Sequence, residues 1–233
     1  MPFMFFSPTY MMFMIPCIIL TMLAQWMVSS AFAKWKRVAN ASGMSGAEAA
    51  HALLYRSGLN DIQIEQVGGT LSDHYDPRAR VLRLSSDVYQ GRSVASIGVA
   101  LHEAGHALQH AQNYAPLAMR SALVPAMATG SQLAWVLIIV GLFIQALHGL
   151  AIIGLLLFGA VVLFSFVTLP VELNASSRAK AAAVELGIVS PGREASGVSQ
   201  VLNAAALTYV AAAATALMQF LYYALLIFGG RRN

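Results

Sequence analysis

The sequence predicts an α-helical membrane protein with about four transmembrane helices and one small α+β soluble domain. Of its 233 residues, 58% are hydrophobic and only 10% are charged, whereas soluble domains carry about 25% charged residues. Four apolar stretches also reach about 20 residues, the length that crosses a bilayer as a helix. No basic stretch is interleaved with stacking aromatic residues, so nucleic acid is not an expected partner.

The first apolar stretch, residues 3–33, carries no charge and is expected to be a transmembrane anchor. Pro8 and Pro16 indicate that its continuous helix begins near Pro8 or later. The sequence Ala31-Phe32-Ala33 resembles a signal-peptide cleavage site. Because the cations follow the apolar run and none precedes it, we expect an uncleaved anchor.

Three further segments follow the soluble domain. Residues 123–169 are expected to form a transmembrane hairpin, whose two spans are separated by His148 and its neighbours. Residues 170–203 read as a helical segment, and residues 204–230 as an alanine-rich transmembrane helix. With four spans, six basic residues fall on one side of the membrane and favour a cytoplasmic soluble domain: Lys34, Lys36, Arg37, Arg178, Lys180 and Arg193. Arg231 and Arg232 fall on the other side and argue mildly against this orientation.

Residues 34–116 contain most of the charge and are expected to form the soluble domain. Ser45 and Glu48 have the spacing of a capping box, which predicts a helix through Arg56 that stops at Gly58. Alternating apolar residues predict a strand over 62–67, and a second strand is expected over 81–84. Ser93 can cap a long helix that runs to Gln112.

This long helix contains the sequence His102-Glu103-Ala104-Gly105-His106. Residues four apart lie on one face of a helix, so both imidazoles can reach a single Zn²⁺ ion. Glu103 lies one step round the helix, close enough to act as general base on a zinc-activated water without being a ligand. The arrangement of strands before such a helix is that of a zincin-like site. The alternative is an accidental pattern on an amphipathic helix.

A catalytic zinc needs a third protein ligand and an open position. Glu172 is the candidate, because it follows Pro170 at the end of an apolar span, where an ionisable residue suggests function. It could instead be a hydrated carboxylate at the membrane surface. His110 shares the helix face of His106, but three successive turns of a straight helix do not easily reach one ion.

Three side chains are candidates to stabilise the oxyanion of a tetrahedral intermediate: His74, Tyr75 and Arg178. The stretch 73–78 can equally be a polar turn held by its own backbone contacts. The strand at 62–67 or the one at 81–84 could present an edge to which an extended substrate adds.

Five stretches of the chain resemble the YugP-like membrane zinc metallopeptidases: residues 71–78, 84–89, 102–106, 169–176 and 201–210. A more distant resemblance is to the HtpX-type membrane peptidases, which combine a cytoplasmic H-E-x-x-H helix with a later glutamate ligand. Glu172 and Ala175 match that second pattern, while Ser176 stands where those peptidases have aspartate. The resemblance implies a zinc site with Glu172 as ligand and leaves open which groups orient the two histidines.

The sequence therefore predicts a membrane-embedded zinc metalloendopeptidase, with His102, His106 and Glu172 as metal ligands and Glu103 as general base. Its expected substrate is a membrane-associated protein or peptide, and its expected location is the inner or plasma membrane of a bacterium. The alternative is a non-catalytic scaffold with a structural or vestigial zinc site. A transporter is disfavoured, because apart from Glu172 the spans lack the interior charges that transport pathways use. The oligomeric state and any membrane partner protein stay open.

Overall fold

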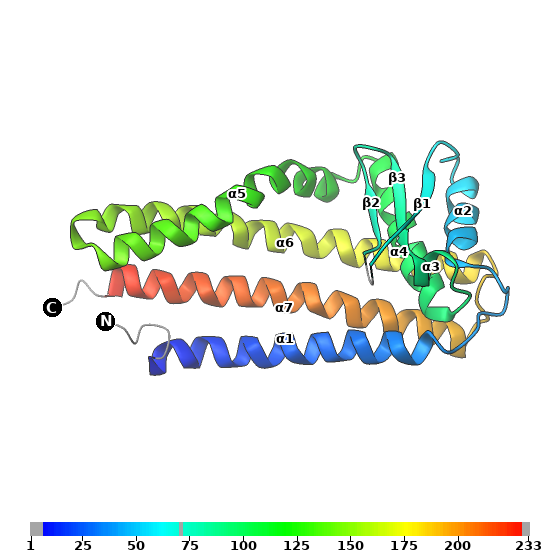
Figure 1. Ribbon diagram of the computed structural model, residues 1–233, viewed down its shortest axis with the longest axis horizontal. Helices are drawn as coiled ribbons and strands as arrows, with labels where there is room; N and C mark the ends of the chain where they lie inside the picture. The colour runs from blue at the N-terminus through cyan, green and yellow to red at the C-terminus, as the bar shows by residue number, and fades with distance from the viewer. Residues whose placement is uncertain (1–6, 70–71, 230–233) are drawn as a thin grey trace. The chain divides into compact units, whose positions relative to one another are not determined.

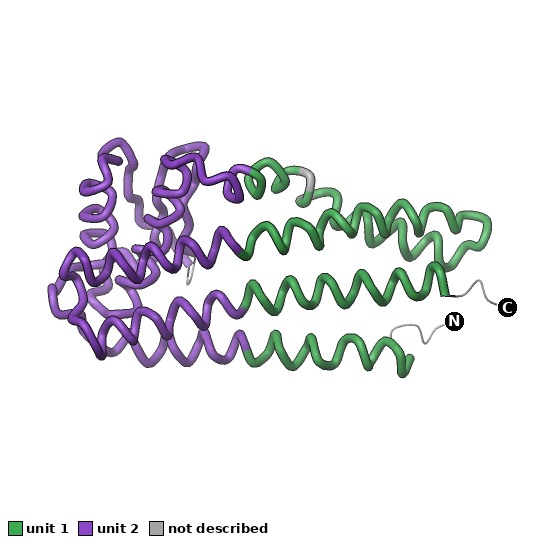
Figure 2. The backbone as a smooth tube through the Cα atoms, turned by 180° about the vertical axis from the view of Figure 1, so that it is seen from behind, with its two compact units in different colours: residues 1–23, 119–169, 208–233 green, residues 24–118, 170–207 purple. Residues whose placement is uncertain are grey.

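The computed structural model describes residues 7–69 and 72–229, which form long helices and one three-stranded sheet (Figure 1). The chain divides into two compact units (Figure 2). Unit 1 comprises residues 1–23, 119–169 and 208–233, and unit 2 comprises residues 24–118 and 170–207. The start of the expected 3–33 anchor, Leu71, Gly230, Arg231 and Arg232 lie outside the described residues.

Among the described residues, three helices are long and apolar enough to cross a membrane. They are α1 (Pro8–Trp35), the stretch Gln145–Glu185 that contains α6 (His148–Glu185), and α7 (Arg193–Gly229). A fourth candidate is α5 (Ala115–Phe143), whose two halves are bent by 59° between Pro125 and Thr129. The structure thus offers three spans, or four if the bent pair counts as one. The predicted start of the first helix at Pro8 agrees with the structure.

Unit 1 is held together by close helix packing between small residues. A Cβ atom added at Gly141 would collide with the backbone nitrogen of Ala151, and one at Gly154 would lie 2.7 Å from the carbonyl oxygen of Ala134. Both sites join α5 to α6. Lipid gives helices no hydrophobic drive to associate, so small residues that allow close contact stabilise such pairs.

Unit 2 contains the sheet, with strand order β1-β3-β2. β1 (Gln63–Val67) pairs parallel with β3 (Val81–Ser85), and β2 (His74–Asp76) pairs antiparallel with β3. The expected strands at 62–67 and 81–84 correspond to β1 and β3. β2 was not predicted, although the polar turn expected nearby follows it: Asp76 Oδ1 accepts hydrogen bonds from the backbone of Arg78 and Ala79.

The expectation that the strand at 81–84 could offer a free edge is wrong. β3 is the central strand and is paired on both sides, so its backbone donors and acceptors are already used. The edges of this sheet belong to β1 and β2. The strand beside α4 (Val94–Ala111) at an edge is β2.

Two helices of unit 2 begin where the sequence predicts. Ser45 and Glu48 form the expected reciprocal capping box at the start of α2 (Gly46–Arg56), and Gly58 has a positive φ of 73° just after its end. Ser93 accepts a hydrogen bond from the backbone of Ser96 at the start of α4. A short helix, α3 (Ser86–Tyr89), links the sheet to this region.

Packing in unit 2 places α4 in the middle of an apolar core. Half of the buried residues of α4 are alanine or glycine, which let its neighbours approach its axis. Its core partners include Leu54 from α2, Leu82 from β3 and Leu202 from α7, all nearly inaccessible to solvent. Two of the three candidate metal ligands, His102 and His106, are therefore carried by a helix that lies within this core.

Candidate metal centre

α4 brings the two histidines of the H-E-x-x-H sequence to one face. His102 and His106 are one turn apart, and their ring centroids lie 4.8 Å from each other with the planes nearly perpendicular. His106 is buried and His102 is half-buried. A helix in an apolar core holds such side chains in fixed rotamers, so their nitrogens present a defined geometry to any ion.

Glu172 reaches the histidines from α6, which passes close to α4 at Gly105. A Cβ atom at Gly105 would lie 3.0 Å from the carbonyl oxygen of Ala175. Glycine between Glu103 and His106 is thus what allows α6 to approach this turn of α4. Glu172 lies three residues before Ala175, on the neighbouring turn of α6, and its side chain is only 2% exposed.

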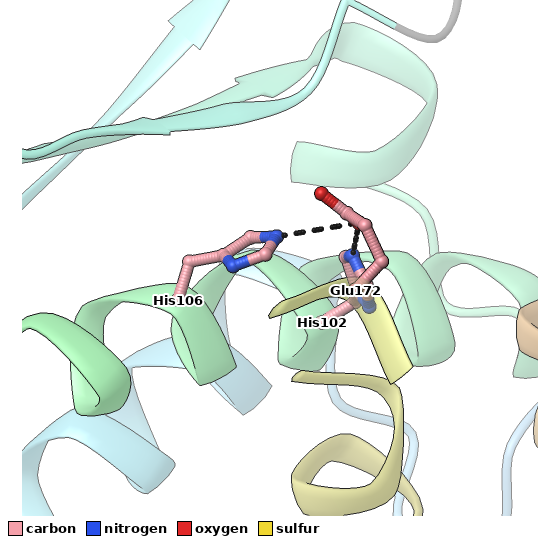
Figure 3. Close-up of side chains that lie close together, drawn as sticks. All are labelled: His102, His106 and Glu172. Atoms are coloured by element: carbon pink, nitrogen blue, oxygen red, sulfur yellow. Dashed lines mark hydrogen bonds and ion pairs between the residues drawn. The ribbon is translucent and has the colours of Figure 1, made fainter. Parts of the chain in front are cut away.

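The three side chains converge as a metal site requires (Figure 3). Glu172 Oε2 lies 3.2 Å from Nε2 of His102 and 3.7 Å from Nε2 of His106, and the three candidate ligand atoms are all within 4.8 Å of one another. Tetrahedral zinc with N and O ligands places neighbouring ligand atoms about 3.3–3.5 Å apart. Two imidazoles and a carboxylate form a donor set used by catalytic zinc, so these residues fit that ion.

The ring nitrogen of each histidine that faces away from Glu172 has a hydrogen-bond partner. The sequence had left open which groups orient the two rings. His106 Nδ1 lies 2.9 Å from Gln109 Oε1, and His102 Nδ1 lies 3.2 Å from Ser176 Oγ. Metal-binding histidines nearly always have such a partner, which orients the ring. Gln109 was not singled out from the sequence, although a glutamine on the alanine-rich buried face of α4 is a signal that could have revealed it.

Glu103 is half-buried beside the cluster. Burial raises the pKa of its carboxyl above the ordinary value; the charges of Glu172 and Asp73 also raise it, while those of His102 and His106 lower it. A carboxylate that is destabilised by burial is a stronger proton acceptor than one in water. Glu103 can therefore accept a proton from a molecule held between the ligands.

The pKa of His106 reflects the same cluster. Burial by itself lowers the pKa of this imidazole, but the nearby carboxylates of Glu172 and Glu103 and the hydrogen bond to Gln109 raise it overall. The pocket thus favours a positive charge at Nε2 of His106. A proton or a metal cation can supply that charge.

His110 is not brought to the cluster. Its Nδ1 lies 2.9 Å from the hydroxyl of Tyr75 on β2. Tyr75 is one of the three candidates for oxyanion stabilisation. It lies on the strand beside α4, and His110 of that helix orients its hydroxyl.

The other two candidates have different surroundings. His74 is exposed, and its Nδ1 lies 2.8 Å from the backbone oxygen of Ser72. The Arg178 guanidinium donates to Asn174 Oδ1 and Gln112 Oε1, at 2.7 Å each. Arg178 is thus engaged in holding polar side chains of α6 and of the end of α4.

Comparison with known proteins agrees with this chemistry. Residues 10–228 match the family described as "Putative neutral zinc metallopeptidase". The chain belongs to this family. It is also similar to the "Putative membrane protease YugP" of Bacillus subtilis (strain 168), with 46% identity over 208 residues that cover 89% of this chain and 92% of the relative. No solved structure matches the chain.

Membership of this zinc metallopeptidase family supports the expected resemblance to YugP-like proteins. The family description supplies the metal, zinc, and the general class of activity. The cluster of His102, His106 and Glu172 is a place where such an ion fits.

Proposed function

We propose that this protein is a membrane zinc metalloendopeptidase in which His102, His106 and Glu172 hold the ion and Glu103 is the general base. The observation that carries the proposal is the convergence of two imidazole nitrogens and one buried carboxylate oxygen from α4 and α6. The family description and the name of the Bacillus subtilis relative support the same class of activity.

When bound, zinc would supply a Lewis acid and lower the pKa of water toward about 7. Glu103 takes a proton from the attacking water and later delivers it to the amine of the leaving group. His102, His106 and Glu172 are held by contacts between α4 and α6, so they need no rearrangement during the reaction. We propose the Tyr75 hydroxyl, held by His110, as the donor to the developing oxyanion.

The proposed fold of the soluble part is zincin-like. Its H-E-x-x-H helix, α4, follows a mixed sheet whose edge strand β2 lies beside it, and the third ligand comes from a later helix. An extended substrate could add to the free edge of β2 and so bring a peptide bond toward the metal. We further propose that this domain faces the cytoplasm, as the six basic residues flanking the spans indicate.

The decisive test is the Glu103→Gln variant in detergent-purified protein or proteoliposomes. Metal content is measured by mass spectrometry, and cleavage is measured on casein and on a membrane-protein substrate. We expect one zinc per chain in both proteins and a loss of at least 10²-fold in cleavage rate for the variant, since general-base catalysis contributes about 10²–10⁴-fold. Glu185→Gln, the same change at an exposed position of α6, is the matched control and should keep full activity.

Two results would contradict the proposal. Undiminished cleavage by Glu103→Gln would remove the mechanism. Stoichiometric zinc without cleavage of any substrate would favour a scaffold with a structural site instead.

A further inference from the structure

Gln109 is a fully buried polar side chain one turn beyond the H-E-x-x-H sequence, and it links α4 to α6. It has 0% exposure. Its Oε1 faces His106 Nδ1 at 2.9 Å, and its Nε2 donates to the backbone oxygen of Val171 at 2.8 Å and to Asn174 Oδ1 at 2.9 Å. A buried amide with every polar atom paired implies a defined role, because leaving any of these atoms unpaired would cost the free energy of removing it from water.

The donors and acceptors in this network can be oriented in only one way. The Val171 oxygen only accepts, so the atom of Gln109 that faces it must be the amide NH₂. The Asn174 atom is likewise an oxygen, because it accepts from the Arg178 guanidinium at 2.7 Å, a group that only donates. Both contacts fix the amide of Gln109, and its oxygen must face His106.

That orientation fixes the tautomer of His106. A carbonyl oxygen cannot donate, so Nδ1 of His106 carries the hydrogen of the bond to Gln109. In the neutral ring Nε2 is then unprotonated, with its lone pair directed toward Glu172 Oε2 at 3.7 Å. This is the form in which an imidazole binds a metal through Nε2.

His102 is held differently. Its Nδ1 faces the hydroxyl of Ser176 at 3.2 Å, and a hydroxyl can donate or accept. Its Nε2 lies 3.2 Å from Glu172 Oε2, so in the metal-free protein the ionised carboxylate favours a hydrogen on that nitrogen. The partner of Nδ1 therefore dictates the metal-binding tautomer at His106, whereas at His102 the partner of Nδ1 permits either tautomer.

The same side chain also holds the segment that carries the third ligand. Val171 and Asn174, the two partners of the Gln109 amide on α6, lie one residue before and two residues after Glu172. The amide thus connects the imidazole of His106 to the turn of α6 around Glu172. A shift of that turn would break these bonds and separate two of the ligands.

We propose that Gln109 is the positioning residue of the metal centre, which selects the Nδ1–H tautomer of His106 and fixes the turn of α6 that presents Glu172. The proposal rests on the proposed zinc site and adds a residue outside the H-E-x-x-H sequence to it. Loss of a group that orients a metal ligand typically weakens metal binding 10–100-fold.

The test compares four variants of the protein in detergent, the fourth being Ser176→Ala. Gln109→Met keeps the size and helix propensity of the side chain but removes all its hydrogen bonds. Gln109→Glu keeps an acceptor for His106 Nδ1. Gln112→Met is the matched control, because it removes a hydrogen bond of Arg178 at the end of α4 without touching His106.

Two readouts are independent of proteolysis. Zinc affinity is measured by competition with a chromophoric chelator, and the His106 tautomer by ¹H–¹⁵N correlation of ¹⁵N-histidine-labelled, zinc-free protein at alkaline pH, where the ring is neutral. We expect Nδ1–H in the wild type and a mixed tautomer in Gln109→Met. Zinc affinity should fall about 10–100-fold in Gln109→Met, recover most of that loss in Gln109→Glu, and change less than about twofold in Gln112→Met.

An Nε2–H tautomer in the wild type would overturn the proposal, as would unchanged zinc affinity in folded Gln109→Met. If Gln109→Met does not fold, Gln109→Glu is compared with Ser176→Ala, which removes the hydroxyl that faces His102. A zinc affinity of Gln109→Glu no higher than that of Ser176→Ala would then also overturn the proposal. Absence of zinc binding in the wild type would instead refute the proposed function, while the tautomer would still decide the role of Gln109.

Discussion

The glycine inside the H-E-x-x-H sequence provides a sharp test of how the metal ligands are assembled. In Gly105→Ala the new Cβ would lie 3.0 Å from the carbonyl oxygen of Ala175 and 3.4 Å from its Cα. Ordinary contacts between carbon atoms are about 3.5–4.0 Å. Relief of the contact therefore requires α4 and α6 to separate locally by a few tenths of an ångström.

That displacement is large enough to affect the site. Binding constellations must be held within about 0.5 Å of their working geometry, and Glu172 is on the turn of α6 next to Ala175. We expect zinc affinity to fall roughly tenfold, equivalent to about 1.4 kcal/mol. Helix propensity favours alanine over glycine by about 1 kcal/mol, which partly offsets an overpacking cost of about 1–3 kcal/mol. Overall stability should therefore change less than metal binding.

Gly98→Ala is the matched control on the same helix, two turns earlier. Its Cβ would lie 3.5 Å from Val198 Cγ1, an ordinary contact. We expect unchanged zinc affinity and a melting temperature about 2–4 °C higher, from about 1 kcal/mol of helix propensity. Zinc competition and thermal unfolding in detergent measure both effects. Equal zinc affinities in the two variants would refute the reasoning that close approach at Gly105 assembles the site.

Three further predictions concern other parts of unit 2. Gly197→Ala should lower the melting temperature, because its Cβ would lie 2.5 Å from the buried ring of Trp35; an unchanged value would show that the ring can move aside. Glu172→Gln should abolish tight zinc binding while the far-ultraviolet circular dichroism stays unchanged, and retained affinity would exclude Glu172 as a ligand. Burial raises the pKa of Asp73 above its unfolded value, while hydrogen bonds from Ser85 oppose the shift. The ionised form of Asp73 therefore lowers the stability of the folded protein. This loss of stability is absent below the ordinary pKa of 3.8 and is complete once the pH has risen through the folded pKa. The melting temperature of Asp73→Asn relative to wild type should accordingly increase from pH 4 to pH 7, and a constant difference would contradict this.

Several local elements were readable from the sequence because their signals are local. The capping box of Ser45 and Glu48, the cap at Ser93 and the start of α1 at Pro8 all follow from residues within one helical turn. Strand β2 was missed because it has only three residues and is stabilised by pairing with β3, a partner that a local pattern does not contain. The same non-local pairing decided that β3 is central.

The sequence by itself determined the membrane class, the helix that carries His102, Glu103 and His106, and the candidacy of Glu172, because hydropathy and i,i+4 spacing are properties of consecutive residues. Only the tertiary structure decided that Glu172 lies within 3.2 Å of His102 and that Gln109 and Ser176 face the second nitrogens of the two rings. The contacts of His102 with Glu172 and Ser176, and of Gln109 with Val171, join residues 62 to 74 positions apart across two helices, whereas the contact of Gln109 with His106 lies within α4. Their formation depends on how closely α4 and α6 pack at Gly105, a distance set by the whole core of unit 2 and by no single segment.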